Sequence, residues 1–370
     1  MAATRAHTTE VGVLMDRDEL IKAAKEAIGE GQLDDYILAP KNHADLLAPK
    51  APALARILRK SEFNAVAGQY ERKDAEAGEA QAIFRNTANR ANWAVFVTVC
   101  LSAALLIVGP SKFGEVGKSL LVGLGLCGMV TGALGAMWLF KVREGKLLEK
   151  WMTARAGAET ARLSYFERVT NVQDADEGSA IPLPILQVEY FRRYQLDIER
   201  AFYKNRGRDH RLAAGRMLTV GAYAVALGSL ATGLAGLLGG AVSSRWVSIA
   251  GLGAIASALS AFASAKEALG QDRRNEERYG RTLDALEGLA EKLDEVRNSA
   301  AEGAREPLQQ FVAAVHEQVS LEHRQWLGAA DNTQASLARL EEALASARAK
   351  LAKPEGPSAS GVASKEQTRG

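Results

Sequence analysis

Four stretches of this sequence contain no Asp, Glu, Lys, Arg or His: Ala91–Ser111, Ser119–Phe140, Met217–Ser244 and Trp246–Ala265. About 20 helical residues, each rising 1.5 Å, span the roughly 30 Å hydrocarbon layer of a bilayer. Each stretch reaches that length, and a soluble core helix rarely needs so long a run without charge. We therefore expect an all-α integral membrane protein with four transmembrane helices, arranged as two repeated helical hairpins with long cytoplasmic helical extensions.

Basic residues flank these stretches unevenly, and the cytoplasmic side of a membrane protein carries an excess of Lys and Arg. Many Lys and Arg residues lie just before the first and third stretches and just after the second and fourth. They are Arg85, Arg90, Lys141, Arg143, Lys146, Lys150, Arg206, Arg208, Arg211, Arg216, Lys266, Arg273 and Arg274. The short loops inside the hairpins hold only Lys112, Lys118 and Arg245. This bias predicts that both termini and the middle segment are cytoplasmic.

Prolines, glycines and charge runs divide the chain into consecutive segments. The predicted segments are a partly disordered N-terminal cytoplasmic segment at 1–60, a first two-transmembrane domain at 61–170 with spans near 91–110 and 119–140, a linker at 171–185, a second two-transmembrane domain at 186–334 with spans near 217–242 and 246–265, a terminal coiled-coil helix at 335–352 and a disordered tail at 353–370. Leu337, Leu340, Leu344, Ala347 and Leu351 form the coiled-coil seam, which can pair within the chain or between subunits.

The two hairpins form a repeat. Tyr70 lies 23 residues before Trp93 at the start of the first apolar block, and Tyr194 lies 23 residues before Met217 at the start of the second. Each unit consists of an approach helix, a hairpin with a short outer loop and an exit helix. Because both hairpins enter from the cytoplasm, the repeat is expected to be parallel.

Small residues recur at helical spacing inside the spans. They are Gly128 and Gly132, then Gly236 and Gly240, and on the last span Ala250, Ala254 and Ala258. Without bulky side chains, helix backbones approach closely, and close packing holds helices together in lipid. These faces predict helix packing, either within the chain or between subunits.

No ionisable residue lies inside any span, which argues against a proton-coupled pump or an ion-selective transporter. A hydrophobically gated, poorly selective pore remains compatible with this pattern. Its candidate pore-lining residues are Ser229, Thr232, Ser257, Ser260 and Ser264. The alternative interpretation is that each hydroxyl bonds only to its own helix backbone. Tryptophans at the span ends, Trp93, Trp138 and Trp246, are predicted interface anchors.

The remaining patterns do not predict an enzyme. Gly123, Gly125 and Gly128 fit G-x-G-x-x-G but lie in a predicted span, where the strand–helix context of a dinucleotide site is absent. His316 and His323 suit a solvated helix face better than a metal site. We find no catalytic, cofactor-binding or metal-ligating arrangement. With a net charge of +2, the chain also has no field that would favour nucleic acid.

Particular residues of both units resemble a known family. They are Tyr70, Trp151, Arg155, Ala158, Glu159 and Arg162 in the first unit, and Tyr194, Arg278, Tyr279, Thr282, Leu286 and the segment from Glu317 through Glu322-His323-Arg324-Gln325-Trp326 in the second. The pattern over about residues 62–334 resembles two tandem SLATT domains, which are two-transmembrane effector modules of bacterial conflict systems.

The resemblance implies a membrane effector of a nucleotide-sensing anti-phage system in the bacterial inner membrane. Such an effector would form a pore or perturb the membrane on activation, as a homo-oligomer, with the lipid bilayer and a cytoplasmic nucleotide-sensing protein as partners. The alternative class is a non-conducting, membrane-anchored scaffold that recruits cytoplasmic partners through its helices.

Overall fold

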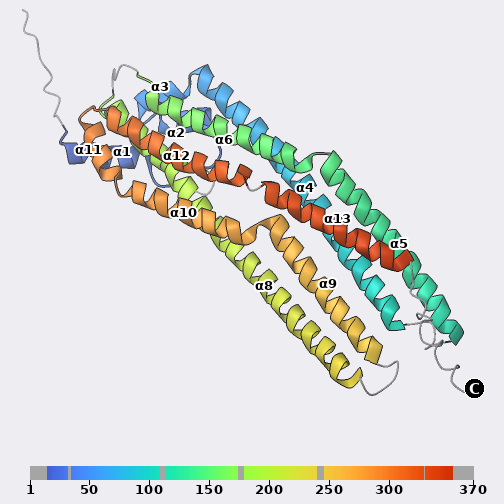
Figure 1. Ribbon diagram of the computed structural model, residues 1–370. Coiled ribbons are helices and arrows are strands. Elements are labelled where there is room, and N and C mark those ends of the chain that lie inside the picture. Colours follow the sequence, from blue (N-terminus) through green and yellow to red (C-terminus); the bar gives the residue numbers. More distant parts are fainter. Residues whose placement is uncertain are drawn as a thin grey trace, which may run out of the picture. The chain divides into compact units, whose positions relative to one another are not determined.

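The computed structural model describes residues 15–31, 35–108, 114–173, 179–239, 246–328 and 330–352, and these contain helices but no strand. The predicted disordered tail, 353–370, and residues 1–14 lie outside this part. The helices are α1 (Arg17–Ile28), α2 (Pro40–Leu47), α3 (Pro52–Leu58), α4 (Ser61–Val108), α5 (Gly114–Glu144), α6 (Leu147–Asn171), α7 (Leu183–Phe191), the π-helical turn η1 (Arg192–Leu196), α8 (Asp197–Gly239), α9 (Trp246–Gly270), α10 (Asp272–Ala290), α11 (Leu293–Ala301), α12 (Glu306–Gly328) and α13 (Ala330–Ala352) (Figure 1).

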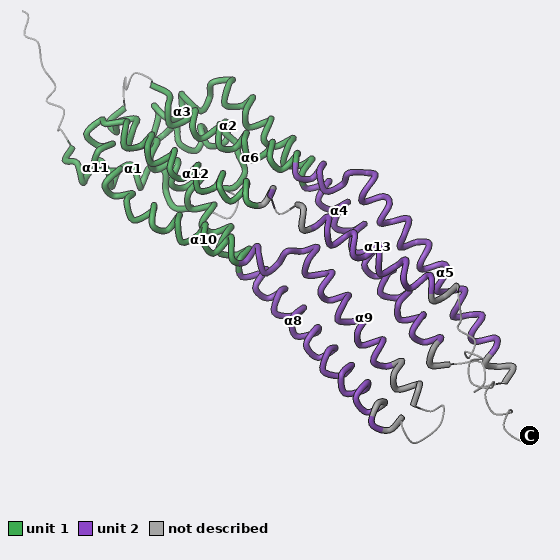
Figure 2. Tube along the Cα trace, in the orientation of Figure 1, with its two compact units in different colours: residues 1–77, 153–207, 277–325 green, residues 78–152, 208–276, 326–370 purple. Residues whose placement is uncertain are grey.

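The chain forms two compact units, and each is assembled from three separate pieces of sequence (Figure 2). Unit 1 comprises residues 1–77, 153–207 and 277–325, and unit 2 comprises residues 78–152, 208–276 and 326–370. Each unit therefore combines parts of both predicted two-transmembrane domains.

Unit 1 has a conventional hydrophobic core in which aromatic rings dominate. Its largest fully buried side chains include Phe63, Tyr165, Phe166, Tyr190, Phe191 and Tyr194. The N-terminal helices contribute to this core through Ala24, Ile28 and Leu54. The first of these helices starts at the predicted Asp16–Glu19 capping box, whose reciprocal hydrogen bonds satisfy backbone donors at the helix start.

A buried ion cluster joins α7 to α11 within unit 1. Glu189 is fully buried and accepts hydrogen bonds from Arg192 Nε at 2.7 Å and Arg297 Nε at 2.5 Å. A buried charge is costly unless it is paired and hydrogen-bonded, and these two guanidinium groups meet that need. The pairs therefore fix how α11 lies on α7.

Unit 2 contains the apolar ends of α4 and α8 together with α5, α9 and α13. The C-terminal helix α13 packs against α5 and α9. Leu340 and Leu344 are buried in a cluster with Ala91 and Val95 of α4 and Leu139 of α5. The leucine seam of the predicted terminal helix thus packs within the chain in this structure.

Large apolar side chains are exposed in quantity on α5 and α8. They include Val122, Leu126, Met129, Met137 and Phe140 on α5, and Leu218, Tyr223, Leu227, Leu230 and Leu237 on α8. Exposure reaches 71% at Val122 and 82% at Leu237. Soluble monomers rarely expose so many neighbouring apolar side chains, and surfaces of this kind mark protein or membrane contacts.

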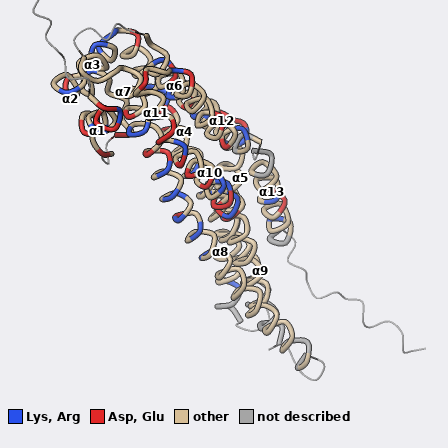
Figure 3. The backbone as a smooth tube through the Cα atoms, turned by 90° about the vertical axis from the view of Figure 1, so that its left-hand side faces the viewer, with Lys and Arg blue, Asp and Glu red and all other residues tan. Residues whose placement is uncertain are grey.

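Two helical stretches in the described residues are long and apolar enough to cross a membrane. One lies within Lys118–Asn171 and the other within Leu183–Leu234. They include the predicted span near 119–140 and, as far as Leu234, the one near 217–242. Figure 3 shows α9 and the second half of α8 almost without charged residues. The chain is thus all-α in its described part, as predicted, with two of the four predicted spans meeting this length and composition.

Candidate functional site: a hydroxyl-lined groove and a buried charge cluster

A groove of about 650 Å³ lies between α8 and α9 in unit 2. Its hydroxyl-bearing residues are Ser229, Thr232, Ser257, Ser260 and Ser264, and the rest of its lining is Ala, Val and Gly. The five candidate pore-lining residues thus come together on one surface. The periodicity explains this, because residues three or four apart lie on one helix face.

The five hydroxyls differ in their hydrogen bonding. Thr232 Oγ1 donates to Gly228 O at 2.8 Å, and Ser257 Oγ donates to Gly253 O at 3.0 Å. The backbone-bonded alternative therefore applies at these two positions. Within the described part of the chain, the hydroxyls of Ser229, Ser260 and Ser264 make no hydrogen bond to protein. Three hydroxyls of the groove thus have no protein partner among the described residues.

Two glycines that sequence reasoning missed close the α8–α9 hairpin. A Cβ added at Gly228 would lie 3.1 Å from Ala256 Cβ, and one at Gly253 would lie 2.6 Å from Thr232 Oγ1. At Gly253 a Cβ atom would be closer than real Cβ atoms come to a neighbour, and at Gly228 the contact with Ala256 would be tight enough to require a small shift. Gly228 could have been found, because it lies eight residues before Gly236 on the same helix face.

The predicted small-residue faces have different surroundings. Gly128 and Gly132 are buried in α5, and a Cβ at Gly132 would contact Arg348 of α13 and Thr98 of α4. On α9, Ala258 is buried and Ala254 is half-buried. Gly236 and Ala250 lie in α8 and α9, but their surroundings, like Gly240 itself, lie outside what the structure describes.

The predicted tryptophan anchors also differ. Trp93 is about half-exposed, and its ring centroid lies 4.6 Å from that of Phe262 on α9. Trp138 is half-buried on α5. Trp246 is the first residue of α9, and its side chain lies outside the described part.

A second feature, the buried charge cluster of unit 1, centres on Arg162 of α6. Arg162 Nε donates to Gln195 Oε1 at 2.9 Å and lies 3.4 Å from Glu199 Oε1. Its Nη1 lies 3.5 Å from Tyr70 Oη on α4. Arg162 and Glu199 are both buried. The cluster thereby links α4, α6, η1 and α8 through one guanidinium group.

Arg155 extends the cluster by one further pair of contacts. It contacts Asp74 Oδ1 at 3.1 Å and Glu159 Oε2 at 3.6 Å. Glu159 is itself buried on α6. The Arg162–Glu199 pair is buried and lies in a low-dielectric site, where its interaction is stronger than at the surface, whereas the Arg155–Asp74 pair is partly exposed.

Burial of the cluster changes its protonation. Burial raises the pKa of Glu199 to about 7, and the neighbouring carboxylates of Glu159 and Glu322 act in the same direction against Arg162 and Arg155. Burial likewise raises the pKa of Glu322 to about 7, opposed mainly by Arg278. Two carboxyl groups of unit 1 therefore change charge near neutral pH.

Many residues behind the family resemblance meet in this cluster. From the first sequence repeat, the cluster contains Tyr70, Arg155, Glu159 and Arg162. From the second repeat it contains the backbone of Tyr194, whose carbonyl oxygen is 3.4 Å from Arg162 Nη2. Trp151 lies elsewhere, in unit 2, where it stacks on Phe84 with ring centroids 5.6 Å apart. Asp74, Gln195 and Glu199 were missed, because polar residues on a long charged helix give no signal of burial.

The prediction of a solvated face for His316 and His323 is wrong. Both side chains are half-buried on α12, and burial lowers the pKa of His316 to about 4 and also lowers the pKa of His323. The described residues contain no group of three His, Cys, Asp or Glu arranged to hold a metal ion.

The raised pKa of Glu199 predicts a pH-dependent stability. Below about pH 4.5 this group contributes its full stabilisation, which is lost as pH rises through about 7 because the folded state holds a proton that the unfolded chain releases. We expect the melting temperature of the wild type to fall relative to that of Glu199→Gln between pH 5 and pH 8. Thermal unfolding in detergent measures this. Exposed Glu167→Gln should follow the wild type, and parallel curves for Glu199→Gln would refute the prediction.

The fold and these two features define an all-helical protein with helices able to cross a membrane and a charged helical unit. Searches of known protein families, curated proteins and solved structures find no match to this chain.

Proposed function

We propose that this protein crosses a membrane four times, through the C-terminal part of α4, α5, the C-terminal part of α8, and α9. The support is the exposed apolar surface of α5 and α8 together with the four charge-free stretches. Exposed side chains such as Leu218 and Val122 are stable against acyl chains but not against water. Unit 1, with its ordinary buried core, is then the cytoplasmic part.

The proposed activity is that of a membrane effector whose second hairpin contributes to a water-permeable passage on activation. The observation that carries it is the groove between α8 and α9, in which three hydroxyls have no partner in the described chain. Hydroxyls in an otherwise apolar wall permit passage of water and ions without strong selectivity. A groove on one hairpin is open on one side, so a closed passage requires several copies, and we propose a homo-oligomer.

The buried charge cluster is the proposed receiver of the activating signal. α4 and α8 are each a single uninterrupted helix, at Ser61–Val108 and Asp197–Gly239, and both supply residues to the cluster and apolar length to a span. A change in the cluster is therefore carried into the spans by continuous helices. On the family resemblance, the signal would come from a nucleotide-sensing partner during an anti-phage response in a bacterial inner membrane.

A non-conducting scaffold is the second candidate function. It is favoured by the backbone hydrogen bonds of Thr232 and Ser257, which leave these two hydroxyls without need of water. In that case the membrane helices only anchor unit 1, which recruits cytoplasmic partners.

Ion flux separates the two candidates. Proteoliposomes containing the full chain should release a trapped fluorescent anion, and cells overproducing the protein should depolarise. Ser229→Leu combined with Ser260→Leu should abolish both effects, because leucine removes the free hydroxyls and fills the groove. Thr219→Leu, at an exposed position outside the groove, is the matched control. Absence of flux in wild-type vesicles that retain inserted protein would favour the scaffold.

A further inference from the structure

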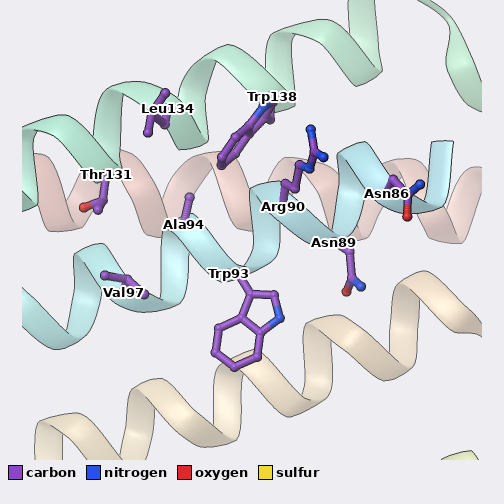
Figure 4. A pocket seen from close by; sticks show the side chains of 9 residues that line it. All are labelled: Asn86, Asn89, Arg90, Trp93, Ala94, Val97, Thr131, Leu134 and Trp138. Carbon is purple, nitrogen blue, oxygen red and sulfur yellow. The ribbon is translucent and has the colours of Figure 1, made fainter. Parts of the chain in front are cut away.

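A second groove in unit 2, between α4 and α5, is polar at one end and apolar at the other. It has a volume of about 460 Å³. Figure 4 shows Asn86 and Arg90 at one end, with the side chain of Asn89 directed away from Arg90, and Val97, Leu134 and Thr131 at the other. This division of polarity resembles that of an amphipathic molecule with one charged end.

The polar end selects a negative charge. Arg90 is exposed and, within the described part of the chain, forms no ion pair. No carboxylate lines the groove. A guanidinium group forms strong, bidentate hydrogen bonds with phosphate oxygens, and the neighbouring amide of Asn86 adds a neutral donor. A ligand with a phosphate group and no net positive charge fits this end.

The two tryptophans of the groove locate it along the membrane axis. Trp138 of α5 and Trp93 of α4 both line it, and Figure 4 shows the Arg90 side chain directed toward Trp138. Tryptophan rings favour the headgroup level of a bilayer. Arg90 and Val97 are separated by about 10 Å of helix, so the apolar end lies where acyl chains begin.

We propose that this groove binds a phospholipid with a net negative headgroup. The phosphate lies against Arg90 and Asn86, and one acyl chain lies along Val97 and Leu134. An ammonium headgroup is disfavoured because the lining offers no carboxylate to receive it. This inference rests on the proposed function for the position of the α4–α5 hairpin in the bilayer.

Native mass spectrometry of the full chain in detergent tests this site. The protein is offered phosphatidylglycerol and phosphatidylcholine with the same acyl chains, in equal amounts. The wild type should retain phosphatidylglycerol preferentially. Arg90→Gln should reduce that preference about tenfold, the effect of losing one hydrogen bond to a charged group. Arg85→Gln, on the same helix but outside the groove, should keep it. An Asn86→Leu variant should also weaken retention, and it serves as the test if Arg90→Gln does not fold.

Two results would overturn the proposal. One is equal retention of the two lipids by the wild type, and the other is an equal loss of preference in Arg85→Gln and Arg90→Gln. Glycerol phosphate, which carries the headgroup chemistry without acyl chains, should not displace the lipid; displacement would assign the site to a free phosphate compound. Membrane insertion and anion flux are measured separately, so a failure of lipid selectivity is distinguishable from a failure of the proposed function.

Discussion

At pH 8, above the raised pKa of Glu199, replacing Arg162 with methionine should lower the free energy of unfolding by about 3–5 kcal/mol, the usual cost of removing one partner from a buried ion pair. Methionine fills much of the space of the arginine stem but cannot satisfy Gln195, and it leaves the buried carboxylate of Glu199 without its nearest cation. We expect the loss to appear in urea unfolding of the detergent-solubilised protein, followed by circular dichroism.

Arg168→Met is the matched control for Arg162→Met, because Arg168 lies on the same helix with an exposed side chain. It should change stability by less than about 0.5 kcal/mol, as expected for a surface substitution. Adding Glu199→Leu to Arg162→Met should recover part of the loss, because it removes the uncompensated charge. Equal stability of Arg162→Met and Arg168→Met would show that the cluster does not hold unit 1 together.

Replacing Gly253 with leucine should separate α8 from α9. Even the first carbon of the new side chain would lie 2.6 Å from Thr232 Oγ1, so the helices must move apart or Thr232 must change rotamer. Overpacking of this kind costs about 1–3 kcal/mol. Because Thr232 lines the hydroxyl groove, anion flux from proteoliposomes should fall to the level of empty vesicles.

Gly233→Leu controls for the loss of a glycine from the same hairpin. A Cβ at Gly233 meets nothing within 4 Å, although the residue adjoins Thr232 and also lines the groove. This variant should insert and melt like the wild type. If Gly253→Leu also melted like the wild type, the close approach of α8 and α9 would not be a determinant of the hairpin. If Gly253→Leu lowered the melting temperature but left the anion flux unchanged, the packing of this hairpin would not be required for conduction.

The sequence predicted well where local pattern is sufficient. Helix class follows from apolar blocks without strand alternation, and the capping box at Asp16 is a local interaction between neighbouring residues. The grouping of Ser229 with Thr232, and of Ser257 with Ser260 and Ser264, follows from helical periodicity alone. The two sets face one another because a short loop joins α8 and α9 into a hairpin.

Contacts between distant segments were not predictable in the same way. Glu199 resembles any surface glutamate of a charged helix, and its burial beside Arg162 depends on how α6 and η1 pack in unit 1. From the sequence, the leucine seam of α13 could pair within the chain or between subunits, because leucines at three- and four-residue spacing fit many apolar surfaces. In the structure these leucines pack on α4 and α5.

By itself, the sequence determined the helical class, the four charge-free lengths and the faces on which glycines and hydroxyls recur, because each depends on residues a few positions apart. Tertiary structure alone decided that Arg162 meets Glu199, that α8 and α9 approach closely at Gly228 and Gly253, and that Arg90 lies at one end of a groove. The physical reason is that burial and close approach are properties of packed surfaces, to which residues far apart in the chain contribute together.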